Sequence, residues 1–247
     1  YLTRYVRIIP NVIVTMLLTV FILPIISRKT ALQTLLIDKP AELCARNGWR
    51  NIFMIHNWFK FEEMCNLHTH HIGTDFELFL IAPFLLILLW KTPRRGYAII
   101  FTMLFIATAL RFYVTYTKEL TYFVPFSTRL STLIQTANYL YTLPSHRFTV
   151  YGIGLLLGFN LRKFRSIKVN NLSFFLGQCV SILAIFVIIS ACKKMLGIDV
   201  QYDKFTHATF AALAPVLACI PIAWLIFLSH VGIKSESQYY FMFNLTD

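Results

Sequence analysis

The sequence predicts an all-α, polytopic transmembrane helical bundle with a disulfide-closed outer loop. The chain has 247 residues, of which 57% are apolar, 16% aromatic and only 14% charged. Its mean hydropathy is +0.63, whereas a soluble domain of this length carries considerably more charge. The apolar residues also gather in runs close to the ~20 residues that a helix needs to cross a bilayer.

Hydropathy along the chain predicts about six spans. They are, in chain order, Ile8 to Ile26, Ile72 to Trp90, Tyr97 to Tyr113, Phe148 to Leu161, Leu172 to Cys192 and Ala208 to Leu228. The fourth run is short, so we expect its helix to begin nearer Pro144. We find no internal repeat or linker that would divide the chain into domains.

Short basic clusters predict the orientation of the spans. They are Lys91, Arg94 and Arg95 after the second span, and Arg162, Lys163, Arg165 and Lys168 after the fourth. Lys and Arg in short loops mark the cytoplasmic side. We therefore expect Arg4 and Arg7 at that side, and the long connections 27–71 and 114–147 outside or in a lumen, with the loop around Asp199. The net charge of +12 is explained in this way and does not indicate nucleic acid, because no soluble basic face is present.

Two cysteines lie in the outer connections, Cys44 and Cys65. An oxidising compartment favours their pairing, so we predict a disulfide between them. Thiolate and imidazole at Cys65, His68, His70 and His71 also suggest zinc, but this spacing matches no common zinc pattern and would leave Cys44 without its partner. We therefore expect no metal.

Acidic residues stand at the mouth of the second span, at Asp75 and Glu77. Ionisable groups at membrane depth are costly and often functional. Asp75 is suited to orient a histidine, with His68 as its partner or as a general base, or to accept a proton from a hydroxyl. The alternative is structural, because an acid near a helix N-terminus is stabilised by the helix dipole. Residues two apart on a helix do not face each other, so Asp75 and Glu77 are not expected to form a dyad.

Three segments resemble the acyltransferase 3 family of integral membrane acyltransferases. YLTRYVRIIP is similar to its arginine motif, in which arginines precede a proline at the start of a span. ELCARNGWRNIFMIHN with EEMCNLHTHHIGTDFELFLIAP resembles its nose-resistant-to-fluoxetine-like branch of nematodes and insects. LPSHRFTVYGIGLLLGF is similar to its proline, arginine, tyrosine and spaced-glycine pattern. The three segments occur in the family's order and spacing.

The resemblance implies acyl transfer from a cytoplasmic acyl-coenzyme A-type donor, which is a co-substrate rather than a cofactor, to a hydroxyl-bearing lipid, glycan or small molecule. The residues that it assigns are His68, Asp75 and Glu77 for catalysis, Arg4 and Arg7 for the donor, and Arg147 and Tyr151 for the substrate. It also implies that the arginines lie on one side of the membrane and the acids towards the other. Alternatively, Arg4 and Arg7 are anchors that bind lipid phosphate.

The sequence also departs from the family pattern. His70 and His71 stand where the family usually has aromatic residues, and the family domain begins before this chain and continues beyond it. We therefore expect residues 1–233 to form a partial acyltransferase 3 domain and residues 234–247 a divergent, cytoplasmic tail. The alternatives are a transporter for lipids or hydrophobic small molecules and a non-catalytic membrane scaffold. The expected partners are membrane lipids, the acyl donor and its acceptor, in the plasma membrane or an endomembrane.

Two further features carry structural expectations. Arg111 lies late in the third span, where we expect it to snorkel outward rather than pair with Glu119. Gly152, Gly154 and Gly158 are expected to permit close helix packing, with the last two four residues apart.

Overall fold

The computed structural model describes residues 1–26, 37–122, 130–163, 170–195 and 202–231. Helices account for nearly all of the described chain, and these ranges contain no strand. The helices are α1 (Leu2–Leu17), α2 (Leu23–Ile26), α3 (Lys39–Ile52), α4 (His70–Lys91), α5 (Pro93–Thr117), α6 (Leu130–Thr136), α7 (Pro144–Lys163), α8 (Asn171–Met195) and α9 (Lys204–Val231). Short turns join them: the π-helical turns η1 (Leu18–Ile22) and η6 (Ala137–Tyr141), and the 3-10 turns η3 (His56–Trp58), η4 (Phe61–Glu63) and η5 (Leu67–Thr69).

Five of the described helical segments are long and apolar enough to cross a membrane. They are Leu2–Ile26, Leu67–Lys91, Pro93–Thr117, Asn171–Met195 and Lys204–His230. The chain is therefore a multi-spanning membrane protein with an all-helical fold, as predicted. The expected fourth span lies in α7, which begins at Pro144 and is 20 residues long. It is more polar than the others because His146, Arg147 and Asn160 interrupt its apolar residues.

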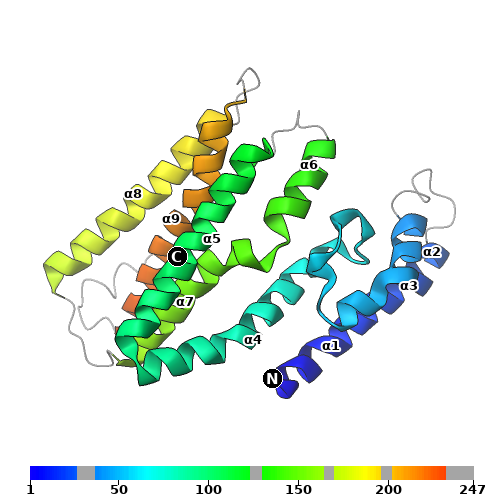
Figure 1. The fold of residues 1–247 in the computed structure, drawn as a ribbon, viewed down its shortest axis with the longest axis horizontal. Helices are drawn as coiled ribbons and strands as arrows, with labels where there is room; N and C mark the ends of the chain where they lie inside the picture. The colour runs from blue at the N-terminus through cyan, green and yellow to red at the C-terminus, as the bar shows by residue number, and fades with distance from the viewer. Residues whose placement is uncertain (27–36, 123–129, 164–169, 196–201, 232–247) are drawn as a thin grey trace, which may run out of the picture.

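α4 joins two groups of helices (Figure 1). At one end of the molecule α1 and α2 lie beside α3, and at the other end α5, α7, α8 and α9 pack together, with α8 on α9. The main core lies where α4, α5 and α7 meet and includes Leu85, Leu89, Ile100, Ala107 and Phe148. This packing holds α4 and α7 next to each other, and the candidate site is built on these two helices.

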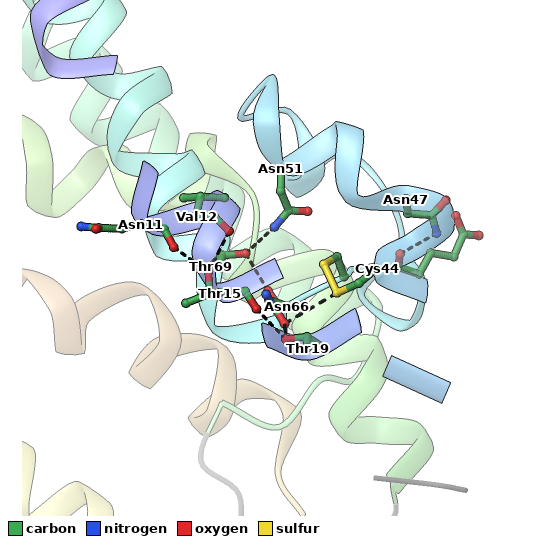
Figure 2. Close-up of a disulfide and its surroundings, with 11 residues drawn as sticks. Asn11, Val12, Thr15, Thr19, Cys44, Asn47, Asn51, Asn66 and Thr69 are labelled. Carbon is green, nitrogen blue, oxygen red and sulfur yellow. Dashed lines mark hydrogen bonds between the residues drawn. A yellow bond between two sulfur atoms is a disulfide. The ribbon is translucent and has the colours of Figure 1, made fainter. Parts of the chain in front are cut away.

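The outer loop between the first two spans contains α3, which the sequence pattern did not predict. The predicted disulfide between Cys44 and Cys65 is confirmed, and it joins α3 to the segment before η5 (Figure 2). Asn47 of α3 also donates a 2.8 Å hydrogen bond to the carbonyl of Glu63. Near the disulfide, the Thr19 hydroxyl lies 3.2 Å from the side-chain oxygen of Asn66. The segment of the outer loop from Glu63 to Asn66 is thus held against α3 and against the first span.

The three glycines of α7 differ in their surroundings. A Cβ atom on Gly152 would lie 2.8 Å from Leu104 of α5, so this glycine permits close packing as predicted. Beside Gly154 and Gly158 no described atom lies within 4 Å of such a Cβ. The prediction that Gly154 and Gly158 permit close helix packing is therefore wrong, because no helix among the described residues packs against either of them.

Arg111 does not snorkel to the surface. Its side chain is 5% exposed, and its Nη1 donates a 3.1 Å hydrogen bond to the carbonyl of His146. Its guanidinium lies 5.5 Å from the ring centre of Tyr122. Glu119 instead lies 4.0 Å from the amine of Lys204. The prediction of snorkelling was wrong because α7 and Tyr122 enclose the side chain before it can reach the membrane surface.

Several predicted features lie outside the described residues. They are the basic residues Arg165 and Lys168, the loop residue Asp199 and the tail 234–247.

Candidate functional site

An ion pair joins the first two spans. Arg4 of α1 donates from Nη2 to Oδ2 of Asp75 on α4. The guanidinium also lies 4.2 Å from the ring centre of Phe79, one turn further along α4. The side chains of Arg4 and Asp75 are 29% and 49% exposed, so the pair is partly open rather than sealed in a core. The ring of Phe79 and the carboxylate of Asp75 together restrict the orientation of the Arg4 guanidinium.

Aromatic residues at the start of α1 dock it onto α4. The Tyr1 hydroxyl donates a 3.3 Å hydrogen bond to the carbonyl of Leu80. The ring of Tyr5 lies 5.8 Å from that of Phe76, and its hydroxyl donates to the carbonyl of Ile52 at 2.9 Å. These contacts fix the first turns of α1 beside the N-terminal half of α4, which places Arg4 opposite Asp75.

The position of Arg4 corrects the prediction that the arginines and the acidic residues lie towards opposite sides of the membrane. We expected Arg4 at the basic, cytoplasmic end and Asp75 towards the outer face, but the two side chains touch. Asp75 precedes Lys91, at the basic end of α4, by 16 residues, which corresponds to about 24 Å along a helix. The prediction failed because α1 begins beside the N-terminal half of α4 rather than at the basic end of that helix. Arg7, one turn further along α1, is exposed and has no ion pair among the described residues.

A third helix brings Tyr151 to the same place. Tyr151 of α7 is partly buried and lines a groove together with Phe79, the ring over which the Arg4 guanidinium lies. Three residues that the sequence marked on separate segments are therefore brought together from α1, α4 and α7. We call Arg4, Asp75 and Tyr151 the central cluster. It combines a carboxylate, a guanidinium and a hydroxyl, which are groups able to accept a proton, bind an anion and donate a hydrogen bond.

His68 and Glu77 lie outside the central cluster. His68 is exposed in η5, seven residues before Asp75, and the described partner of Asp75 is Arg4 rather than His68. Glu77 accepts a 3.1 Å hydrogen bond from the indole nitrogen of Trp58 in the outer loop. The structure thus does not bring these two predicted residues to Asp75.

Arg147 belongs to an aromatic and basic group at the outer mouth. Its guanidinium lies 4.4 Å from the ring centre of Tyr141, and its Nε donates to the carbonyl of Tyr141 at 3.2 Å. The ring of His70 lies 4.9 Å from that of Tyr141 and 3.8 Å from that of His71. Arg147 precedes Tyr151 by one helical turn, so this group lies next to the central cluster along α7.

Sequence reasoning missed a buried polar network that holds the outer loop on α4. Asn57 donates a 2.9 Å hydrogen bond to the hydroxyl of Thr74, which contacts the carbonyl of Thr142 at 3.2 Å. A Cβ atom on Gly73 would lie 2.8 Å from both Asn57 and His56. The Gly73–Thr74 pair, within the segment EEMCNLHTHHIGTDFELFLIAP, is the signal in the sequence that indicates this close approach of the outer loop to α4.

Burial of His56 makes stability depend on pH. His56 is 1% exposed, and burial lowers its pKa from 6.5, although the backbone of Thr69 and of Arg50 acts in the opposite direction. The unfolded state therefore binds the proton more readily than the folded state. Stability is full above the unfolded pKa and is lost as the pH falls from there through the lower folded pKa, by about 1.4 kcal/mol in total for each unit by which the two pKa values differ.

We expect the melting temperature of the protein in micelles to fall between about pH 7.5 and pH 5. His56→Gln should show a smaller fall, because it removes the titrating group. His68→Gln, at an exposed position, is the control and should follow the wild type. Equal pH dependence in wild type and His56→Gln would contradict this assignment.

An apolar groove of about 870 Å³ runs from the central cluster along α4 and α7. Phe79 and Tyr151 line one end of it, and Trp90, Pro93 and Arg162 line the other. Apolar side chains dominate the wall between these ends, among them Pro83, Leu86, Leu155 and Phe159.

Comparison with known protein families identifies the chain. A family model described as an acyltransferase domain matches residues 1–243. The chain belongs to this acyltransferase domain family. Searches of curated proteins and of solved structures found no match. The family match spans all three helices that carry the central cluster of this acyltransferase-family protein.

Proposed function

We propose that this acyltransferase-family protein transfers an acyl group from a cytoplasmic acyl-coenzyme A-type donor to a hydroxyl group of a lipid, glycan or small molecule. One observation carries the proposal: Arg4, Asp75 and Tyr151 converge from three helices inside the region that matches the family. Acyl transfer to a hydroxyl needs a base for the hydroxyl proton and a donor for the developing oxyanion, and this cluster holds both kinds of group.

In this proposal Asp75 accepts the proton of the acceptor hydroxyl as that oxygen attacks the thioester carbonyl. The ester C–O bond forms, the C–S bond breaks, and the released thiolate takes up the proton that Asp75 accepted, which restores the carboxylate. Arg4 fixes the orientation of Asp75, and the Tyr151 hydroxyl donates to the carbonyl oxygen as it becomes negative. Each of these roles rests on the position of the group in the central cluster.

The other predicted residues keep supporting roles in the proposal. Arg7 is exposed one turn from Arg4, and in this proposal it binds a donor phosphate only if the donor enters the bundle well beyond the basic end of α4. Arg147, next to His71 at the outer mouth, is suited to bind an anionic part of the acceptor. His68 lies on the outer side of Asp75, whereas Glu77 lies two residues further along α4, and the part of both in catalysis remains a prediction.

The motif order supports placing the protein in the nose-resistant-to-fluoxetine-like branch of the family, in the plasma membrane or an endomembrane. Placing the donor on the cytoplasmic side rests on the basic residues Lys91, Arg94 and Arg95 where α4 meets α5.

A direct test is to incubate the protein, purified in lipid nanodiscs, with radiolabelled acyl-coenzyme A and a membrane lipid extract, and to separate the products. We expect labelled ester to form with the wild type and to fall by about a hundred-fold with Asp75→Asn, which keeps the shape but removes the base. Label that binds without forming product in the wild type would favour a carrier for hydrophobic molecules and reject the proposal.

A further inference from the structure

The apolar groove has the two chemical parts of a lipid site. Its wall offers almost no hydrogen-bonding partner between Tyr151 at one end and Arg162 at the other. A hydrocarbon chain suits such a wall, whereas polar groups would lose their hydrogen bonds to water without replacement. Phe79 and Trp90 are 11 residues apart on α4, which makes the groove about 16 Å long. That length accommodates a long acyl chain.

The mouth of the groove is basic and lies where two candidate membrane spans, Leu67–Lys91 and Pro93–Thr117, end and begin. Arg162 lines the groove and is exposed, and Lys91, Arg94 and Arg95 are exposed where α4 meets α5. The sequence contains no acidic residue from 78 to 118 or from 130 to 198, so no carboxylate of α4, α5, α7 or α8 offsets these charges at that end. Trp90 lines the same mouth and is 74% exposed, as is typical of tryptophan at the membrane interface.

Gly158 keeps the middle of the groove open. It lines the groove, and no described atom lies within 4 Å of a Cβ built on it. A larger residue at this position would project into the path of a bound chain. Gly154, one turn earlier on α7, has equally open surroundings but does not line the groove. The chain therefore offers a matched pair of positions for a test.

We propose that this groove binds one anionic phospholipid from the leaflet at the basic end, with its phosphate at Arg162 and one acyl chain between α4 and α7. Charge complementarity selects the headgroup, because a zwitterionic lipid gains less from a mouth that carries only cations. The chain end then lies against Phe79 and Tyr151, beside the central cluster. The groove shares Tyr151 with the central cluster, but lipid binding here does not depend on the proposed catalytic role.

The test is native mass spectrometry of the purified protein with phosphatidylglycerol or phosphatidylcholine of identical acyl chains. We expect one tightly retained phosphatidylglycerol, and Arg162→Ala should weaken its binding about five-fold, towards the level of phosphatidylcholine. Lys193→Ala removes a charge from the far end of α8 and should change nothing.

Gly158→Leu should weaken binding of both lipids about ten-fold, since it removes space for the acyl chain. Gly154→Leu should bind as the wild type. Leucine favours a helix over glycine, so both variants are expected to fold, which circular dichroism and gel filtration will check. Equal binding of the two lipids by the wild type, no effect of Arg162→Ala, or the same effect of Gly158→Leu and Gly154→Leu would each overturn the proposal. So would a dimer in which a second copy fills the groove.

Discussion

Arg4→Ala is expected to lower the turnover of acyl transfer by about a hundred-fold while the protein still inserts in the membrane. The substitution removes the described ion-pair partner of Asp75 and the cation over Phe79, so the carboxylate loses its fixed orientation. Insertion should persist because Arg4 stands at the edge of a long apolar segment, Leu2–Ile26, that contains the hydrophobic residues needed to cross the bilayer.

Arg7→Ala is the matched control for this prediction. Arg7 is exposed one turn away on the same helix, so its loss removes an equal charge without breaking the ion pair. We expect it to raise KM for the donor more than it lowers kcat, because its proposed contact is with a donor phosphate. Kinetics in nanodiscs, with membrane content measured for each variant, separate the two effects. If Arg4→Ala retained wild-type kcat, Arg4 would have no place in the catalytic site.

Removal of the disulfide is expected to have the largest effect on stability. The bond between Cys44 and Cys65 closes a sequence separation of 21 residues, and a loop of this size contributes about 3 kcal/mol in the chain-entropy model. It joins α3 to the segment that leads into α4, and both sulfur-bearing residues are buried. Without it, the outer loop depends on contacts such as the 3.0 Å ion pair between Arg50 and Glu63.

The double variant Cys44→Ala with Cys65→Ala tests this expectation by denaturant unfolding in micelles. Cys179→Ala, at an exposed free cysteine, is the control and should leave the free energy of unfolding unchanged. Treatment of the wild type with a reductant should lower stability to the level of the double variant. A double variant as stable as the wild type would show that the outer loop is held by its other contacts.

The membrane fold follows from the sequence because hydropathy depends on each residue's own chemistry. The second span was predicted as Ile72 to Trp90 and is found within α4, His70–Lys91, and the third, predicted as Tyr97 to Tyr113, lies within α5, Pro93–Thr117. The disulfide was also predictable, since the predicted topology left only Cys44 and Cys65 in the outer connections.

The geometry of the site was not predictable from local patterns. Arg4 and Asp75 are 71 residues apart, and their contact depends on where the aromatic residues of α1 dock on α4. The rule that basic residues mark the cytoplasmic side describes average positions and placed Arg4 at the wrong depth. The spacing of Gly154 and Gly158 is typical of helix packing, but spacing alone does not determine whether another helix lies against these residues. In the structure no described atom lies within 4 Å of a Cβ built on either glycine.

The most direct test of the account is a double-mutant cycle on the rate of acyl transfer, with Arg4→Ala, Asp75→Ala and the double variant. If Arg4 and Asp75 act as one unit, removing either should cost nearly as much as removing both, so the double variant should be about as active as the weaker single variant. Losses that multiply in the double variant would contradict this account, because they would mean that the two residues act independently despite their contact.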